Sequence, residues 1–178
     1  MSKSALKKQL SAMTHEQISE LVLELYSARK EAKEYLDFYV NPDIDEKLDK
    51  ARVAITKEMK RKSGQWANPR ITRVRKQIKN IATLNPGYEH IAEISSYAVE
   101  AACVMINDSR TKESVQRNIA KLLHEAIAMS DKAGMLNVHM ARIRKAIDGM
   151  DTPHFRSNQL KRALNEAFHE AIASLAAI

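Results

Sequence analysis

Hydrophobic residues recur three and four positions apart along most of this chain, which is the spacing of one face of an α-helix. The clearest example runs from Thr14 to Pro42, where charged residues flank an apolar stripe. Thr14 can cap the first turn with its hydroxyl, and Gln17 can reach back to complete a capping box. Pro42 ends the stretch, because the residue before a proline is pushed out of the helical region. We therefore expect one uninterrupted helix over residues 15–40, about 39 Å long.

Seven further segments show the same periodicity and are separated by turn residues. They span residues 4–12, 44–62, 69–83, 88–106, 112–132, 136–148 and 154–176. The segment 88–106 is apolar over much of its surface, so we expect it to be the most buried. No stretch shows the alternation of a β-strand. The pattern predicts an all-α fold of seven to eight helices, forming a single domain over residues 1–178, as an irregular helical bundle or a short array of helical hairpins.

Two of these segments have similar sequences. HEAIAM at residues 124–129 and HEAIAS at residues 169–174 share five residues at an offset of 45. A period of this length occurs in two-helix repeat proteins. The alternative is that two alanine-rich amphipathic helices match by chance, and no third copy can be traced in the sequence.

The composition of the 178 residues is typical of a globular helical protein. Hydrophobic residues make up 44% and charged residues 29%, with only 4 Gly and 4 Pro, so residues that break helices are rare. No apolar run approaches the roughly 20 residues that span a bilayer, and the N-terminus is charged where a secretory leader would be apolar. The single Cys103 cannot form an internal disulfide. We therefore expect a cytoplasmic protein without a membrane segment.

The whole chain has a net charge of +7, and its positive charge is concentrated in one part of the sequence. Between residues 57 and 79 there are nine basic residues and one acid, Glu58, with the only tryptophan among them. We call this stretch the basic segment. Its candidate binding residues are Lys57, Lys60, Arg61, Lys62, Trp66, Arg70, Arg73, Arg75, Lys76 and Lys79.

The basic segment has three interpretations. It could bind a polyanion such as nucleic acid, with Trp66 stacking on a base. It could bind an acidic protein surface, including the acid-rich face of a second copy of the chain. It could also be a solvated helix face, or pair within the molecule with the acids Glu20, Glu24 and Glu31 of the 15–40 helix. The sequence does not choose between them.

No recognisable catalytic or cofactor motif is present. The glycine-rich phosphate loops, the GxSxG nucleophile motif and the CxxC motif are all absent. His124 and His169 each precede a glutamate, as in the zinc motif HExxH, but Ala128 and Ala173 stand where the second histidine is needed. Cys103 lies in an apolar run, as a buried structural cysteine does. We therefore expect no catalytic site, no metal and no cofactor.

The stretch LYSARKEAKEYLDFYVNPD, residues 25–43, is more specific than apolar spacing requires. It resembles the opening of a bacterial family of cytoplasmic proteins of unknown function, with the phrase L-Y-x-x-R-K-E-x-K-E-Y-L-x-F-x-x-N-P. The resemblance implies an all-helical fold and no established activity, so it assigns no functional residues. It leaves four motif residues with an open role: Tyr26, Arg29, Glu31 and Tyr35.

Together these features favour a non-enzymatic cytoplasmic protein-interaction module. The expected partner is an acidic protein surface or a second copy of the chain, which would make a homodimer. The alternative is nucleic-acid binding through the basic segment. The first interpretation predicts that no deep polar pocket gathers titratable groups, and the second predicts one continuous exposed basic surface.

Overall fold

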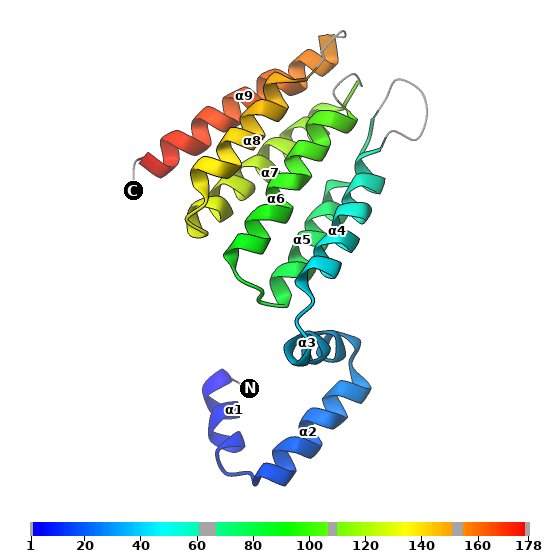
Figure 1. Ribbon diagram of the computed structural model, residues 1–178, viewed down its shortest axis with the longest axis vertical. Helices are drawn as coiled ribbons and strands as arrows, with labels where there is room; N and C mark the ends of the chain where they lie inside the picture. Colours follow the sequence, from blue (N-terminus) through cyan, green and yellow to red (C-terminus); the bar gives the residue numbers. More distant parts are fainter. Residues whose placement is uncertain (1, 61–66, 107–109, 151–154, 177–178) are drawn as a thin grey trace. The chain divides into compact units, whose positions relative to one another are not determined.

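The structure is a computed structural model that describes residues 2–60, 67–106, 110–150 and 155–176 (Figure 1). Within these ranges the chain forms helices and no β-strand, so the all-α prediction is confirmed. The helices are α1 (Lys3–Leu10), α2 (His15–Ala28), α3 (Lys30–Val40), α4 (Ile44–Met59), α5 (Ile71–Thr83), α6 (Tyr88–Met105), α7 (Glu113–Lys132), α8 (Leu136–Asp148) and α9 (Phe155–Ala176). None of them is long and apolar enough to cross a membrane.

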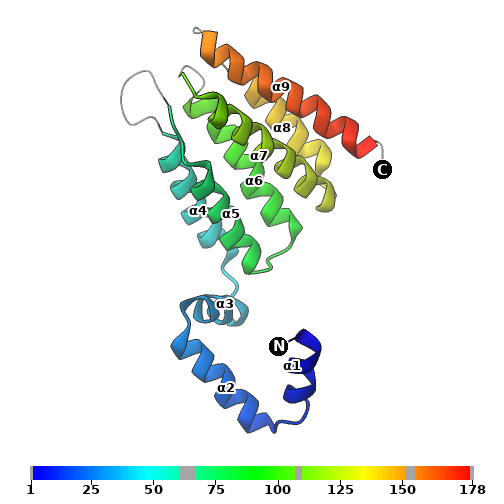
Figure 2. The same cartoon turned by 180° about the vertical axis from the view of Figure 1, so that it is seen from behind.

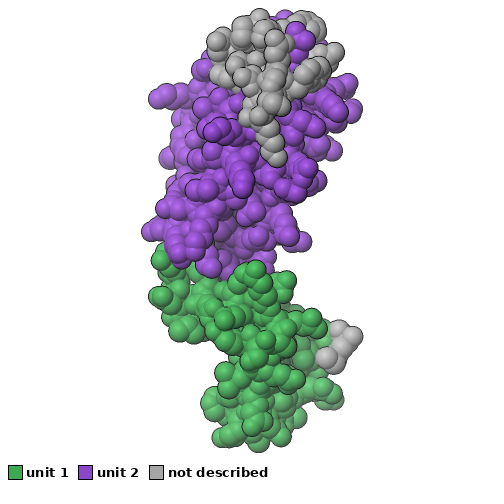
Figure 3. Space-filling view, turned by 90° about the vertical axis from the view of Figure 1, so that its right-hand side faces the viewer, with its two compact units in different colours: residues 1–43 green, residues 44–178 purple. Residues whose placement is uncertain are grey.

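The chain divides into two compact units, unit 1 over residues 1–43 and unit 2 over residues 44–178 (Figure 3). Unit 1 contains α1 to α3, and unit 2 contains α4 to α9. The single domain expected from the sequence stays a prediction, and the two units are described separately below.

The expected helix over residues 15–40 is interrupted, which is why the described ranges hold nine helices and the predicted count of seven to eight is wrong. Arg29 has an extended backbone, with φ −131° and ψ 117°, between α2 and α3. The Tyr26 hydroxyl donates a hydrogen bond to the Asp37 carboxylate at 2.9 Å. In a continuous helix these residues would be about 16 Å apart along the axis. The contact therefore requires the break, and it gives the motif residue Tyr26 a structural role.

Two further interactions support unit 1 locally. The Lys33 Nζ lies 5.3 Å from the centre of the Tyr26 ring, which is within the range of a cation–π interaction. The predicted capping box is present, because Thr14 Oγ1 accepts from the Gln17 backbone N–H and Gln17 Oε1 accepts from the Thr14 N–H. The side chain of Tyr26 thus contacts two residues of α3 and joins it to α2.

The substitution Tyr26→Phe tests this role, because it removes the hydroxyl donor and keeps the ring. We expect the α2–α3 turn to loosen and the amides in the first turn of α3 to exchange with deuterium severalfold faster. Hydrogen exchange followed by mass spectrometry measures this. Tyr35→Phe is the matched control, since no hydrogen bond of the Tyr35 hydroxyl is found within the described ranges. Equal exchange in the two variants would contradict the assigned role.

Unit 2 is an array of three helical hairpins, one of the two architectures expected from the sequence. The hairpins are α4/α5, α6/α7 and α8/α9, and they stack side by side (Figures 1 and 2). The first helices of the hairpins form one layer, and the second helices form the other. Helix α7 lies at the centre and contacts α5, α6, α8 and α9.

The similar sequences HEAIAM and HEAIAS fall on equivalent helices of this array. They lie in α7 and α9, the second helices of consecutive hairpins. The three second helices begin at residues 71, 113 and 155, so their spacing is regular. The His124 Nε2 of α7 lies 3.6 Å from the Glu170 Oε2 of α9. The two histidine–glutamate sequences, each of which lacks the second histidine of the zinc motif, thus lie on neighbouring helices.

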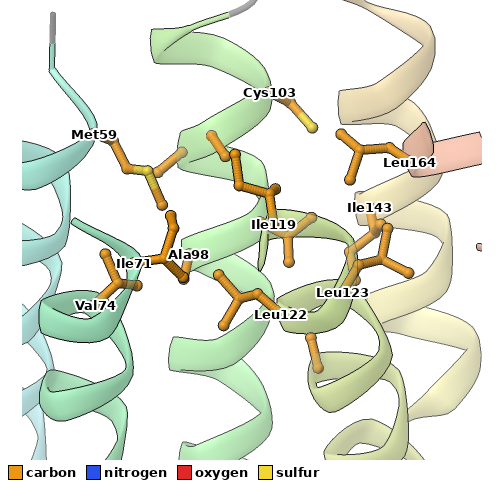
Figure 4. Close-up of a cluster of buried hydrophobic side chains, with 14 of the residues drawn as sticks. Met59, Ile71, Val74, Ala98, Cys103, Ile119, Leu122, Leu123, Ile143 and Leu164 are labelled. Carbon is orange, nitrogen blue, oxygen red and sulfur yellow. The ribbon is translucent and has the colours of Figure 1, made fainter. Parts of the chain in front are cut away.

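The core of unit 2 fills the space between the two layers. Figure 4 shows Ile119, Leu122 and Leu123 of α7 between side chains of the first hairpin and those of the third. Nine residues of α6 are buried, in agreement with the apolar pattern of residues 88–106. The largest fully buried side chains are Ile55, Met59, Ile94, Ile106, Ile119, Leu122, Leu123, Ile127, Ile143, Ile147, Leu160 and Leu164.

Candidate functional site

A network of charged side chains crosses the layer formed by α4, α6 and α8 in unit 2. Arg142 of α8 donates from Nη2 to Glu93 at 3.3 Å and to Glu100 at 3.2 Å, both on α6. Arg52 of α4 donates to the same Glu93 at 3.2 Å. Arg52 also lies over the ring of Tyr97, 5.9 Å from its centre. The network therefore ties one helix of each hairpin to the next.

These ion pairs hold their members in the charged state. Partial burial acts to raise the pKa of Glu93, but the hydrogen bonds and positive charges of Arg142 and Arg52 outweigh it and lower that pKa below its usual value. The hydrogen bond to Glu93 raises the pKa of Arg142 against the opposing effect of burial. The carboxylate and both guanidinium groups therefore remain ionised at neutral pH, unlike a general acid or base poised to exchange a proton.

A pocket of about 410 Å³ opens beside the network, between α6 and α8. Its wall includes Val104, whose surface is 62% exposed. The Cys103 thiol also borders it, and burial raises the pKa of that thiol to about 12. A thiol with this pKa is protonated at neutral pH and is a poor nucleophile. The residues that line the pocket are Glu100, Cys103, Val104, Arg142, Lys145, Ala146 and Gly149.

His139 of α8 is fully buried, and neither ring nitrogen has a hydrogen-bond partner among the described residues. Burial lowers its pKa, and the positive charge of Arg142 adds to this effect against the opposing charges of Glu93 and Glu100. The imidazole is therefore held in its neutral form. Two buried polar atoms without partners are a cost to the folded state.

The substitution His139→Leu is expected to stabilise unit 2 by about 1 kcal/mol, because it replaces an unpartnered polar ring by an apolar side chain. It should also remove a pH dependence. Since the folded-state pKa lies below the ordinary value of 6.5, the unfolded chain binds a proton more readily, and the wild-type protein loses stability as pH falls below that value. Urea unfolding at about pH 7.5 and about pH 5.5 measures both effects.

His169→Leu is the matched control, because His169 is exposed on α9. We expect it to keep the wild-type pH dependence. A His139→Leu protein that loses stability between these two pH values as steeply as the wild type would show that His139 is not the responsible group.

The described residues of the basic segment fall into two groups, those whose side chains form ion pairs and those whose side chains do not. Arg73 Nη1 pairs with Glu58 at 2.9 Å, and Arg75 Nε pairs with Glu125 at 3.0 Å, so both arginines are bound to acids of unit 2. Arg61, Lys62 and Trp66 lie outside the described residues. The remaining members are exposed, and their side chains have no ion pair or hydrogen bond within the described ranges: Lys57, Lys60, Arg70, Lys76 and Lys79.

Unit 1 differs from unit 2 in that none of the residues of α1, α2 and α3 is buried. The apolar stripe that predicted a core-facing helix is open instead. Tyr39 and Val40 are 76% and 82% exposed. The large hydrophobic residues of unit 1 that are more than a third exposed are Leu6, Val22, Leu23, Leu25, Tyr35, Tyr39 and Val40. We call this set the uncovered apolar surface.

A groove of about 330 Å³ lies on α2, beside the uncovered apolar surface. Met13 and Leu21 give it an apolar part, and Glu20 and Glu24 give it two carboxylates one helical turn apart. Gln17, whose side chain belongs to the capping box, completes its lining. We call this feature the α2 groove. Its lining therefore combines apolar side chains with negative charge.

The other motif residues lie on the surface of unit 1. Arg29 occupies the break between α2 and α3. Glu31 and Tyr35 are exposed on α3, and no hydrogen bond or ion pair of either side chain is found in the described part of the chain. Of the four motif residues, only Tyr26 is thus explained by contacts within unit 1.

Comparison with known proteins assigns the chain to a family. A model of the Family of unknown function (DUF6155) matches residues 1–169. The chain belongs to the DUF6155 family. No curated protein and no solved structure gives a significant match. The family match covers unit 1 and most of unit 2, and it confirms the expected relation to a family of unknown function, while the motif and the bacterial origin stay predictions.

The described residues contain no group of three or more His, Cys, Asp and Glu side chains able to hold a metal ion. This DUF6155 protein has two candidate features, a charged network in unit 2 and an apolar surface with a groove in unit 1. In unit 2, the carboxylates of Glu93 and Glu100 are ion-paired with the guanidinium groups of the charged network. In unit 1, the uncovered apolar surface and the α2 groove are not covered by other described residues of that unit.

Proposed function

We propose that this DUF6155 protein is a non-enzymatic protein-interaction module, in which unit 1 supplies the docking surface and unit 2 is the folded scaffold. The observation that carries the proposal is the uncovered apolar surface. Seven large hydrophobic side chains are more than a third exposed within a segment of 43 residues. A separate unit of only about 40 residues rarely stabilises its own fold without a disulfide, a metal or a partner.

The charged groups of unit 2 support the non-enzymatic part of the proposal. Glu93 is ion-paired with Arg142 and Arg52, and the Cys103 thiol is protonated at neutral pH. These groups therefore stabilise the layer of α4, α6 and α8, and none of them is poised for acid–base or nucleophilic chemistry. A free, buried cysteine is also in keeping with the cytoplasm, where we place the protein.

Site-specific photo-crosslinking in cells that produce the protein tests the docking role. A photo-reactive amino acid at Leu23 or Tyr39 is expected to give discrete protein adducts, which mass spectrometry identifies. Val53 of α4 is the matched control, because it is 70% exposed but belongs to unit 2. The proposal fails if Leu23 and Tyr39 give no discrete adduct, or if Val53 gives the same adducts.

Nucleic-acid binding is a second candidate function, favoured by five exposed cations of the basic segment whose side chains have no ion pair within the described residues. Lys76 and Lys79 lie on α5, a helix without any acidic residue. Phosphate contacts would release counterions, so binding would weaken steeply with added salt. Fluorescence anisotropy with a short duplex and a single-stranded oligonucleotide tests it, with Lys76→Glu/Lys79→Glu as the weakened variant and Lys145→Glu as control. Absence of binding at low salt would end this candidate.

A further inference from the structure

The first two helices of unit 1 carry opposite charges. The charged residues of α1 are Lys3, Lys7 and Lys8, and this helix contains no acid. The charged residues of α2 are Glu16, Glu20 and Glu24, and this helix contains no lysine or arginine. No ion pair between the two helices is found in the described residues of the chain.

The positions of these charges match when a helix like α1 is laid on the α2 groove. Lys3 and Lys7 are one turn apart, as are Glu20 and Glu24, so each pair is separated by about 6 Å along its helix. Both pairs flank an apolar row. In α1 this row contains Leu6, which is 42% exposed, and in the groove it contains Leu21. Helix α1 and the α2 groove therefore complement each other both in apolar contact and in charge.

The lengths agree as well. Helix α1 has 8 residues and is thus about 12 Å long. The groove extends along α2 from Gln17 to Glu24, which is about 10 Å of helix. No residue of α1 lines the groove in its own copy. The groove is therefore not occupied by α1 of the same copy.

We infer that the partner of unit 1 is a second copy of the chain, with α1 of each copy seated in the α2 groove of the other. The arrangement is reciprocal, so the two Lys–Glu contacts are made twice and the interface closes on itself as a twofold dimer. It covers Leu6 and Leu21 in both copies. This inference rests on the docking role proposed for unit 1 and names its occupant.

Sedimentation velocity of the full-length protein between about 1 and about 100 µM tests the inference. The wild-type chain is expected to dimerise across this range, and added salt should weaken the dimer because surface ion pairs are screened. The acidic-groove variant Glu20→Lys/Glu24→Lys and the basic-helix variant Lys3→Glu/Lys7→Glu should each weaken it at least about tenfold.

Mixing the two variants separates pairing between copies from pairing within one copy. The unchanged α1 of the first variant then meets the unchanged groove of the second, and the two substituted surfaces are again of opposite charge. The mixture should therefore form a heterodimer about as strong as the wild-type dimer. A fluorescent label on one variant makes this species visible in the sedimentation profile. Circular dichroism verifies that each variant keeps the helix content of the wild-type protein.

A monomeric wild-type protein throughout the concentration range overturns the inference. So does a dimer that both variants form with wild-type affinity, or a mixture that fails to associate. These failures are distinguishable from failure of the docking role itself. Cross-links from Leu23 and Tyr39 to another protein, together with a monomeric wild type, would keep the docking role and remove the second copy.

Discussion

Replacing Leu122 with alanine is expected to lower the free energy of unfolding of unit 2 by about 3 kcal/mol. Leu122 is fully buried in α7, the helix that contacts α5, α6, α8 and α9. Its removal leaves a cavity between the two helical layers, and the surrounding hairpins can fill it only in part because α7 is held from four sides. Urea unfolding followed by circular dichroism measures the change.

The matched control is Leu23→Ala in unit 1. It removes the same atoms from a side chain that is 65% exposed, so we expect a change within about 0.5 kcal/mol. The comparison tests the division of the protein into one unit with a core and one without. Equal losses at Leu122 and Leu23 in dilute protein would show that unit 1 has a core of its own.

The second large effect is expected for Arg142→Met, which leaves Glu93 and Glu100 without their main cation. Breaking a fully buried pair in this way costs roughly 3–5 kcal/mol. The side chains of Arg142 and Glu93 are 35% and 27% exposed, and water partly compensates, so we expect about 2 kcal/mol at neutral pH. Lys145→Met on the same helix is the control, and it should change stability by less than about 0.5 kcal/mol.

The pH dependence of this loss follows from the pKa of Glu93. In the wild-type protein that pKa lies below its ordinary value of 4.5, so the pair contributes stability above this pH and loses it as pH falls through the lowered pKa. In Arg142→Met, protonation of Glu93 removes a charge that only Arg52 still compensates. The two unfolding free energies should therefore converge below about pH 4.5. A gap that stays constant from neutral pH into this acidic range would argue against the ion pairs as its cause.

Local signals in the sequence predicted much of the secondary structure. The three- and four-residue spacing of apolar residues places most of the helices, because one face of each helix must be covered. The capping box of Thr14 and Gln17 is present as expected. The turns near Gly134 and Gly149 end α7 and α8 where the pattern stops. The echo between residues 124–129 and 169–174 lies on α7 and α9, the second helices of consecutive hairpins, although its offset of 45 residues differs from the 42 residues between the first residues of these helices.

The break at Arg29 could not be predicted from propensity, because Ser27, Ala28, Arg29 and Lys30 include neither glycine nor proline. The break allows the hydrogen bond between Tyr26 and Asp37, two residues that are 11 positions apart and could not meet within one continuous helix. The charged network was missed for a similar reason. Arg142 is 49 residues from Glu93, and only the stacking of hairpins brings them together.

The apolar stripe of α2 shows the limit of periodicity as evidence for a core. Ile18, Leu21 and Leu25 have the spacing of a buried face, yet none of them is buried in the structure. Periodicity predicts that a face must be covered and does not say by which chain. The basic segment has the same limit, since Arg73 and Arg75 pair within unit 2 while Lys76 and Lys79 lie in solvent.

Hydrogen exchange of the full-length wild-type chain at about 1 µM and about 100 µM is the most direct test of unit 1 as a self-docking element. The amides of α1 and α2 are expected to exchange markedly more slowly at the higher concentration, because a second copy then covers them. The amides of α6 and α7 should exchange equally at both concentrations. If α1 and α2 exchange at the same rate at both concentrations, unit 1 does not dock onto a second copy.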